Sequence, residues 1–285
     1  MDRIHFITQL IRCRFTRRKT EEQSVDLSTP PRRTKGQAFI ELALVLPILI
    51  LLVLGVVEIA LFTGRYLDIL DLTREAARFA SVRDPFELYV GPRDCGDADN
   101  FNFFFHTSCI FSPPVGSPDC NTPSWCPDDG SGNPGKCFCN GLNPYLVFDP
   151  DRDDIVMSVY TVTNTEDPAT HVVSNQVTNV WPPSGYWALS NPDGTGDPNL
   201  ENWKNDCDGN VDLTKTPHFT PSVVNSMLSA SAPPSKGFVA VEFYYCYDQA
   251  LNVPIITDII PNPLRLNAYT LMPLPEAAPT PTPMP

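Results

Sequence analysis

The sequence predicts an α+β protein with one long N-terminal helix, apolar on every face at first and then amphipathic, followed by an antiparallel sheet. Three observations support this fold class. Residues 42–57 are sixteen residues without a charge, residues 66–80 repeat apolar side chains at helical spacing, and three later segments resemble strands. Two turn-rich insertions, 85–148 and 165–235, separate these elements.

The apolar run is long enough to cross a membrane. Residues 38–62 are 25 residues in which only Glu41 and Glu58 are charged, and at about 1.5 Å per residue they exceed a ~30 Å hydrocarbon core. A core helix of a soluble protein would instead be amphipathic. A secretory signal peptide is the main alternative, but its apolar region has only about 7–15 residues and ends in a small-x-small cleavage site. No such site precedes residues 66–68. We therefore expect the segment to stay in the membrane.

The charges on either side of this run predict its orientation. Before Gly36 there are nine basic and four acidic residues, whereas the rest of the chain has 11 basic and 29 acidic residues. The positive-inside rule then places the N-terminus in the cytoplasm and the bulk of the chain outside. The net charge of −13 argues against a nucleic-acid partner. Residues 1–35 are interpreted either as a disordered leader or as a basic segment on the inner leaflet.

The helix is expected to continue beyond the membrane, to a total of roughly 45 residues. Apolar and small side chains recur at helical spacing and need an apolar surface to pack on; they are Tyr66, Ile69, Leu70, Thr73, Ala77 and Ala80. The helix should end near Asp84, because the residue before a proline avoids the α region.

The predicted strands lie at residues 154–163, 237–247 and 264–272, where β-branched and aromatic residues are frequent. Residues 253–263 are expected to form a short helix or an exposed apolar loop. The predicted organisation has five parts: a basic cytoplasmic leader at 1–36, a transmembrane helix at 37–63, its amphipathic continuation at 64–84, an extracytoplasmic disulfide-rich domain at 85–274 and a disordered Pro-rich tail at 275–285.

Nine cysteines indicate an oxidising compartment for most of the chain. Cys13 lies on the predicted cytoplasmic side. The other eight are the disulfide candidates: Cys95, Cys109, Cys120, Cys126, Cys137, Cys139, Cys207 and Cys246. An even number outside the cell predicts up to four disulfides, whose pairing the sequence leaves open. A zinc site is disfavoured, because no two C-x-x-C pairs are present.

One acidic loop resembles the start of an EF-hand calcium loop, because oxygen-bearing side chains occupy alternate positions: Asp206, Asp208, Asn210 and Asp212. Val211 stands where such a loop has glycine, and Pro217 stands where it has glutamate. A second acidic cluster comprises Asp149, Asp151, Asp153 and Asp154. Solvated turn residues are the alternative for both. Calcium is thus the one cofactor considered, and none is required.

Catalysis finds little support in the sequence. His106, His171 and His218 lack H-E-x-x-H spacing and a plausible thiol partner, and neither a G-x-S-x-G elbow nor a glycine-rich phosphate loop is present. The protein is therefore not expected to be an enzyme.

The segment Gly36-Gln37-Ala38-Phe39-Ile40-Glu41 resembles a prepilin-type processing site. More narrowly, the run resembles the TadE-like proteins of tight-adherence (Flp) pilus systems, through Gly36, Gln37, Ala38, Glu41, Ala43, Leu44, Pro47, Gly55, Glu58, Ala76, Ala77, Arg78 and Ala80 in order. The resemblance covers about residues 34–82. It implies a pilin-like fold, a peptidase cut after Gly36, and a mature chain with Gln37 first and Glu41 fifth.

The resemblance also implies a role for Glu41, which in pilins pairs with the N-terminal amine of a neighbouring subunit. From the residues alone, Glu41 could equally reach water at the inner membrane surface, since a buried carboxylate costs roughly 2.5–3.5 kcal/mol on insertion scales. Glu58 is expected to reach water at the outer surface.

The sequence thus predicts a TadE-like minor pilin, pseudopilin or assembly component of a bacterial tight-adherence pilus or secretion system, anchored by a single membrane pass. Its expected partners are the membrane, other pilin-like or pilus-assembly proteins that contact the N-terminal helix, and a prepilin-type peptidase. The alternative is an unprocessed, signal-anchored surface binding protein with a disulfide-stabilised outer domain.

Overall fold

The computed structural model describes residues 35–86, 101–112, 146, 148–149, 151–166, 168–171, 173–228, 236–252, 257 and 260–274. The chain divides into two compact units, Met1–Ile50 and Leu51–Pro285. Several sequence-based expectations lie outside the described residues: those for the leader before Lys35, for the tail after Leu274, and for five of the disulfide candidates, Cys95, Cys120, Cys126, Cys137 and Cys139.

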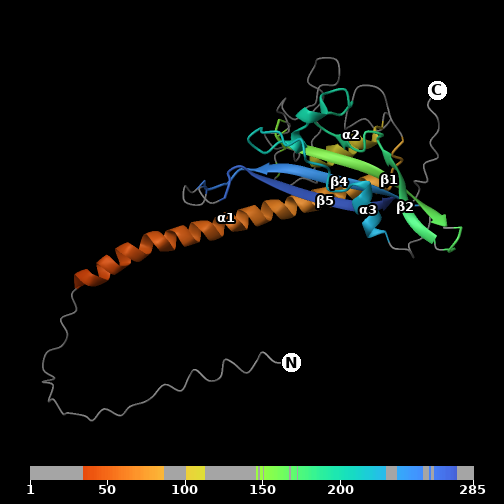
Figure 1. Ribbon diagram of the computed structural model, residues 1–285. Coiled ribbons are helices and arrows are strands. Elements are labelled where there is room, and N and C mark those ends of the chain that lie inside the picture. The colour runs from red at the N-terminus through yellow and green to blue at the C-terminus, as the bar shows by residue number, and fades with distance from the viewer. Residues whose placement is uncertain are drawn as a thin grey trace, which may run out of the picture. The chain divides into compact units, whose positions relative to one another are not determined.

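The first element is helix α1 (Lys35–Ser81), which has 47 residues and runs through Pro47 (Figure 1). In the first unit, the described side chains from Ala38 to Ile50 are all exposed. The helix ends three residues before the expected Asp84. There the N–H of Arg83 bonds to the carbonyl of Ala80 at 3.1 Å, and the Asp84 carboxylate accepts the N–H of Phe86 at 2.9 Å. These bonds satisfy backbone groups that a helix end leaves unpaired.

The second unit is built on an antiparallel sheet (Figure 1). Its strands are β1 (Asp154–Glu166), β2 (Val173–Trp181), β3 (Trp187–Ala188), β4 (Lys236–Tyr247) and β5 (Leu264–Leu274). The order is β2-β1-β4-β5, and β3 pairs with β1. The three predicted strands are β1, β4 and β5. The α+β class with a long helix and an antiparallel sheet is confirmed.

The second half of α1 packs on one face of the sheet. Its Ile69, Ala77 and Ala80 are fully buried, as the apolar stripe predicted, whereas Tyr66 is 37% exposed. The facing residues alternate along each strand and share one core with the helix: Ile155, Met157 and Val159 from β1, Val239, Val241 and Phe243 from β4, and Leu266, Ala268 and Leu274 from β5. Alanines at the contact leave little side-chain bulk between helix and sheet.

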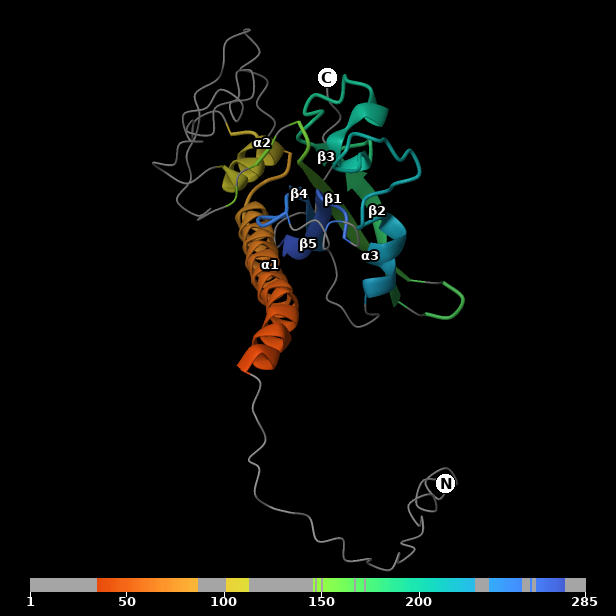
Figure 2. The ribbon, with the colours of Figure 1, turned by 90° about the vertical axis from the view of Figure 1, so that its left-hand side faces the viewer.

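The second insertion covers the opposite face of the sheet. It contributes α3 (Pro221–Met227) and two short 3₁₀ turns, η3 (Pro198–Leu200) and η4 (Asn202–Lys204). Val224 and Phe219 pack on Tyr160 and Ala240, and Trp203 packs on Val156 and Tyr244 in a separate cluster. Figure 2 shows α1 and α3 on opposite sides of the strands. The sheet is therefore covered on both faces.

Part of the first insertion belongs to the core, which corrects the expectation of a loop-rich segment. Helix α2 (Phe103–Ser108) continues into η1 (Cys109–Phe111), and residues 103–112 are all buried. Phe103, Phe104 and Phe111 join the core beneath α1. The Asn102 side chain caps α2 by accepting the N–H of Phe105 at 3.1 Å. These aromatic residues are thus part of the hydrophobic core and do not form a turn.

Candidate assembly site on the N-terminal helix

The predicted processing site lies in the first turns of α1. Gly36 is exposed, and no atom lies within 4 Å of the position that a Cβ would occupy. Gln37 follows in the same turn, and Glu41 is exposed just over one turn further along. The three predicted assembly residues therefore lie in the first turns of one helix, where Gly36 and Glu41 are exposed.

The apolar surface of α1 extends from this start toward Val57. Leu44, Leu52 and Val56 are 69%, 67% and 67% exposed. A contiguous exposed apolar surface of this size is unfavourable in water, so it needs lipid or other apolar side chains around it. The helix is long and apolar enough to span a membrane.

Glu58 is buried, not solvated at the membrane surface, which corrects the sequence-based expectation. Its side chain is only 6% exposed. The carboxylate accepts the hydroxyl of Tyr247 at 2.9 Å, the N–H of Ala250 at 3.0 Å and the N–H of Leu251 at 2.9 Å. These donors lie at the end of β4 and in the connection that follows it. We call this arrangement the Glu58 clasp.

One aromatic contact supports the Glu58 clasp from the side. The ring of Phe62, one turn further along α1, meets the ring of Tyr247 edge-on at 5.6 Å. Burial, together with the hydrogen bond to Glu58, raises the pKa of Tyr247 to about 12, so the phenol keeps its proton at neutral pH and stays a donor. Sequence reasoning missed this role of Glu58; a carboxylate late in an apolar helix was the available signal.

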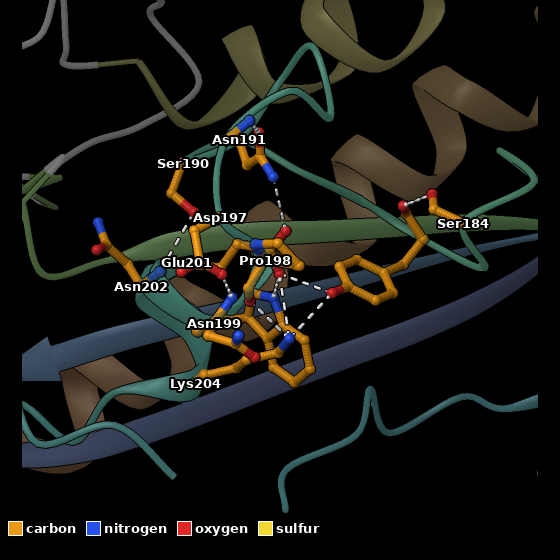
Figure 3. Close-up of polar contacts among 12 residues, drawn as sticks. Ser184, Ser190, Asn191, Asp197, Pro198, Asn199, Glu201, Asn202 and Lys204 are labelled. Carbon is orange, nitrogen blue, oxygen red and sulfur yellow. Dashed lines mark hydrogen bonds and ion pairs between the residues drawn. The ribbon is translucent and has the colours of Figure 1, made fainter. Parts of the chain in front are cut away.

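One buried carboxylate of the outer domain, that of Glu201, holds parts of the second insertion together. Figure 3 shows Glu201 facing Asn191, whose amide donates to it at 3.0 Å. Glu201 also accepts the Tyr186 hydroxyl at 2.7 Å and the Trp203 indole N–H at 2.8 Å. Lys204 lies 3.6 Å from the same carboxylate. Since Glu201 is only 5% exposed, these buried contacts join separate parts of the second insertion to one another.

Two neighbouring aspartates of the second predicted acidic cluster are also buried. Burial raises the pKa of Asp153 to about 7, against the N–H groups of Asp149 and Cys246, which donate to the carboxylate. Burial likewise raises the pKa of Asp154 to about 6, against hydrogen bonds from Ser190 and Trp203. Both carboxylates are therefore buried hydrogen-bond acceptors that stabilise the start of β1.

A pocket of about 220 Å³ lies between the second insertion and the sheet. Lys215, Glu242 and Arg265 contribute its charges. Burial lowers the pKa of Lys215 and of Arg265, and it raises that of Glu242. Each is nevertheless bonded within the fold. Lys215 donates to the carbonyl of Asn205, and Arg265 donates to the carbonyls of Arg152 and Asn202. Glu242 accepts the N–H groups of His218 and Phe219. The three charged groups around the pocket therefore stabilise the contact between the second insertion and the sheet.

The candidate calcium loop is closed on itself. Asp206 accepts the N–H groups of Asp208 and Asn210 at 3.1 and 2.7 Å, and Asp212 accepts the N–H of Thr214 at 2.9 Å. Hydrogen bonds from Asn210 and Thr214 lower the pKa of Asp206 and Asp212 respectively. Within the described ranges, no three His, Cys, Asp or Glu side chains gather as metal ligands would. Calcium binding stays a prediction.

Two of the disulfide candidates are joined to each other: Cys207 of the second insertion bonds to Cys246 of β4, across 39 residues of sequence. Cys109 is disulfide-bonded as well.

The three histidines considered for catalysis make separate contacts. The His106 ring bonds to the backbone of Asn102, the His218 ring stacks on Tyr269 at 3.6 Å, and His171 is an exposed residue with φ 53°.

Comparison with known proteins points to α1. Residues 36–78 match the family model described as TadE-like protein. No curated protein and no solved structure matches the chain. This family is a pilus-associated structural and assembly family, not an enzymatic one. The chain therefore carries a TadE-like segment in α1, and this segment and a helix able to span a membrane fit a Tad pilus-associated protein.

Proposed function

We propose that the protein is a minor pilin or pseudopilin of a tight-adherence (Flp-type) pilus or secretion system, held by one membrane pass with its N-terminus in the cytoplasm. One observation carries the proposal: α1 exposes apolar side chains along its first half but buries one face of its second half against the outer domain. A helix of this kind can leave its apolar half to lipid or to the helices of neighbouring subunits.

The proposal includes cleavage by a prepilin-type peptidase after Gly36. A glycine with open space around it suits a protease, whose active site must approach the backbone closely. The new N-terminal amine would belong to Gln37. Glu41, exposed one turn away, would then offer its carboxylate to the amine of a neighbouring subunit. Within a membrane such an ion pair lowers the cost of both charges.

The test is the intact mass of the membrane-extracted protein after co-expression with a prepilin-type peptidase. We expect a chain that begins at Gln37 and a Gly36→Leu variant that begins at Met1. Gly64→Leu is the matched control, because Gly64 also lies in α1 with open space around its Cβ position and should leave cleavage unchanged. An uncut wild-type chain would contradict the pseudopilin assignment.

The second candidate is an unprocessed, signal-anchored surface binding protein. The observation that favours it is the size of the outer domain, whose second insertion is joined to β4 by a disulfide and held internally by the buried carboxylate of Glu201. The same mass measurement separates the two. A chain that begins at Met1 in the wild type and in both variants supports the anchored surface protein.

A further inference from the structure

Glu58 of α1 holds the start of the connection between β4 and β5. The Glu58 carboxylate accepts the N–H groups of Ala250 at 3.0 Å and Leu251 at 2.9 Å. The carboxylate is buried, so water does not compete for these bonds. The first residues of the connection are therefore held at the level of Glu58 along the helix.

That level lies near the outer end of the apolar run at residues 38–62. The stretch from Ala38 to Val57 has 20 residues. At about 1.5 Å per residue it covers roughly 30 Å, which is the thickness of a bilayer's hydrocarbon core. Glu58 is the next residue, and Tyr66, 37% exposed, follows two turns later, where tyrosine is favoured at a membrane surface.

Both described ends of the connection present apolar side chains at this level. Leu251 is 38% exposed and Ile260 is 42% exposed. Gln249 ties the ends together, because its backbone N–H donates to the Asn262 side chain at 2.9 Å and its own amide donates to the carbonyl of Ile260 at 3.2 Å. Asn262 also donates to the Asn252 side chain at 2.9 Å. Leu251 and Ile260 are thus held near the same clasp.

Exposed leucine and isoleucine side chains favour an apolar surrounding by about 25 cal/mol per Å² of buried apolar area. Lipid is the apolar surrounding that the adjacent helix already requires. We propose that Leu251 and Ile260 enter the outer interface of the bilayer beside α1, so that the outer domain touches the membrane at a second point. This inference rests on the proposed membrane anchoring.

A second contact would change how the domain sits on the membrane. A domain joined by a helix alone can pivot about the helix, whereas a domain with two contacts keeps one face toward the lipid. The Glu58 clasp is then a positioning device that sets the depth of Leu251 and Ile260.

The test measures lipid contact residue by residue in the full-length protein. Cysteine replaces Leu251, Ile260, Val45 or Leu213 in turn in a Cys13→Ser background, and the Cys13→Ser protein itself is the blank for labelling of the other eight cysteines. Each protein is labelled without reductant with an environment-sensitive fluorophore and reconstituted in phosphatidylcholine–phosphatidylglycerol vesicles. Quenching by a lipid carrying a shallow nitroxide is compared with quenching by a water-soluble nickel chelate. Val45 reports on the membrane span, and Leu213, 65% exposed on the second insertion, is the matched control.

We expect lipid quenching at Leu251→Cys and Ile260→Cys to exceed that at Leu213→Cys at least threefold. Adding Glu58→Gln should reduce it at Leu251→Cys and leave Val45→Cys unchanged. Quenching at Val45→Cys with no excess at the two connection sites overturns the second contact and leaves the anchored helix intact. If that excess is absent in vesicles but both sites are protected from the water-soluble chelate in assembled filaments, the two side chains contact a protein partner instead. Absence of quenching at Val45→Cys overturns the membrane anchoring and the inference together.

Discussion

Glu58 illustrates how a single charged residue is accommodated in an apolar helix. A carboxylate in a membrane segment costs roughly 2.5–3.5 kcal/mol on insertion scales. Hydrogen bonds to a charged group contribute about 1.5–3 kcal/mol each when they replace an unpaired state. Three donors, one at the end of β4 and two in the connection that follows it, bind this carboxylate. The acid is therefore compatible with its position because the outer domain, not water, solvates it.

Replacing Glu58 by alanine should lower the free energy of unfolding by about 2–3 kcal/mol, because two backbone N–H groups and a tyrosine hydroxyl lose their acceptor. Glu75→Ala is the control. That glutamate pairs with Arg78 on the exposed face of α1 at 2.9 Å, and surface pairs contribute little. Denaturant titration in detergent, followed by tryptophan fluorescence, measures both. Equal effects of the two substitutions would argue against the clasp.

Asp153 predicts a pH dependence of stability. Burial raises its pKa to about 7 in the folded protein, from 3.8 for an unperturbed aspartate. The folded state therefore holds the proton more tightly than the unfolded state, and stability present below about pH 4 is lost as the pH rises to about 7. Asp154, with a pKa of about 6, acts in the same direction.

We expect the free energy of unfolding to fall between pH 5 and pH 7, and Asp153→Asn to reduce that fall by about 1–2 kcal/mol. Denaturant titrations across this range measure the slope. Asp151→Asn is the control, since Asp151 is an exposed residue of the same loop. A slope that Asp153→Asn leaves unchanged would show that Asp153 does not titrate in this window.

At the scale of elements, the second half of α1 depends on small side chains. Ala76, Ala77 and Ala80 are each 0% exposed, and they share one cluster with the inner faces of β1, β4 and β5. The exposed pairs Asp71–Arg74 and Glu75–Arg78 lie on other faces of the helix and add little. Close packing against the sheet therefore holds this half of the helix.

Ala77→Leu should lower the free energy of unfolding by about 1–3 kcal/mol, because three added carbons have no space between helix and sheet. Arg74→Leu serves as control, since it places the same side chain on an exposed face of α1. Thermal unfolding followed by circular dichroism compares the two. An Ala77→Leu variant as stable as the wild type would mean that the helix sits further from the sheet.

The elements that could be predicted from sequence are those with a strong period of their own. The helix α1 and the strands β1, β4 and β5 follow from apolar repeats, and their ends moved by at most three residues. Strand β2 escaped prediction because Ser, Asn, Gln and Thr interrupt its apolar residues, and pairing with β1 holds it in place. Helix α2 escaped because six residues are too few to show a helical repeat, although all six are buried.

The residues of the predicted processing site could be named from the sequence alone. Gly36, Gln37 and Glu41 stand in a local motif, and their role stays a prediction. The partners of Glu58 lie 189 to 193 residues further along the chain, and only the folded sheet brings them together. The same holds for Cys207 and Cys246, whose pairing no spacing rule could select.

At the scale of the whole molecule, the second insertion is a layer fastened to the sheet at separate places. The Cys207–Cys246 disulfide joins it to β4. Arg265 of β5 donates to the carbonyl of Asn202 at 2.9 Å, and the hydroxyl of Tyr160 in β1 donates to the carbonyl of Phe219. Attachment to three strands makes the layer part of the fold rather than a free loop.

Replacing Cys207 and Cys246 together by serine should lower the free energy of unfolding by about 3–4 kcal/mol, because a cross-link over a loop of this length restricts the unfolded chain. Denaturant titration without reductant measures the loss. Cys13→Ser, in the leader, is the control and should have no effect. A double variant as stable as the wild type would place the stability of the layer in its hydrogen bonds and aromatic contacts.

The Glu58 clasp also makes the chain sensitive to hydrophobic mismatch. Because Glu58 is the first buried residue along the described part of α1, the number of residues before it sets the lipid thickness that the protein matches without tilting or stretching the bilayer. A clasp moved one helical turn along α1 would change that thickness by about 5 Å. Lateral sorting between thin and thick membrane regions would then follow from the spacing of a single carboxylate.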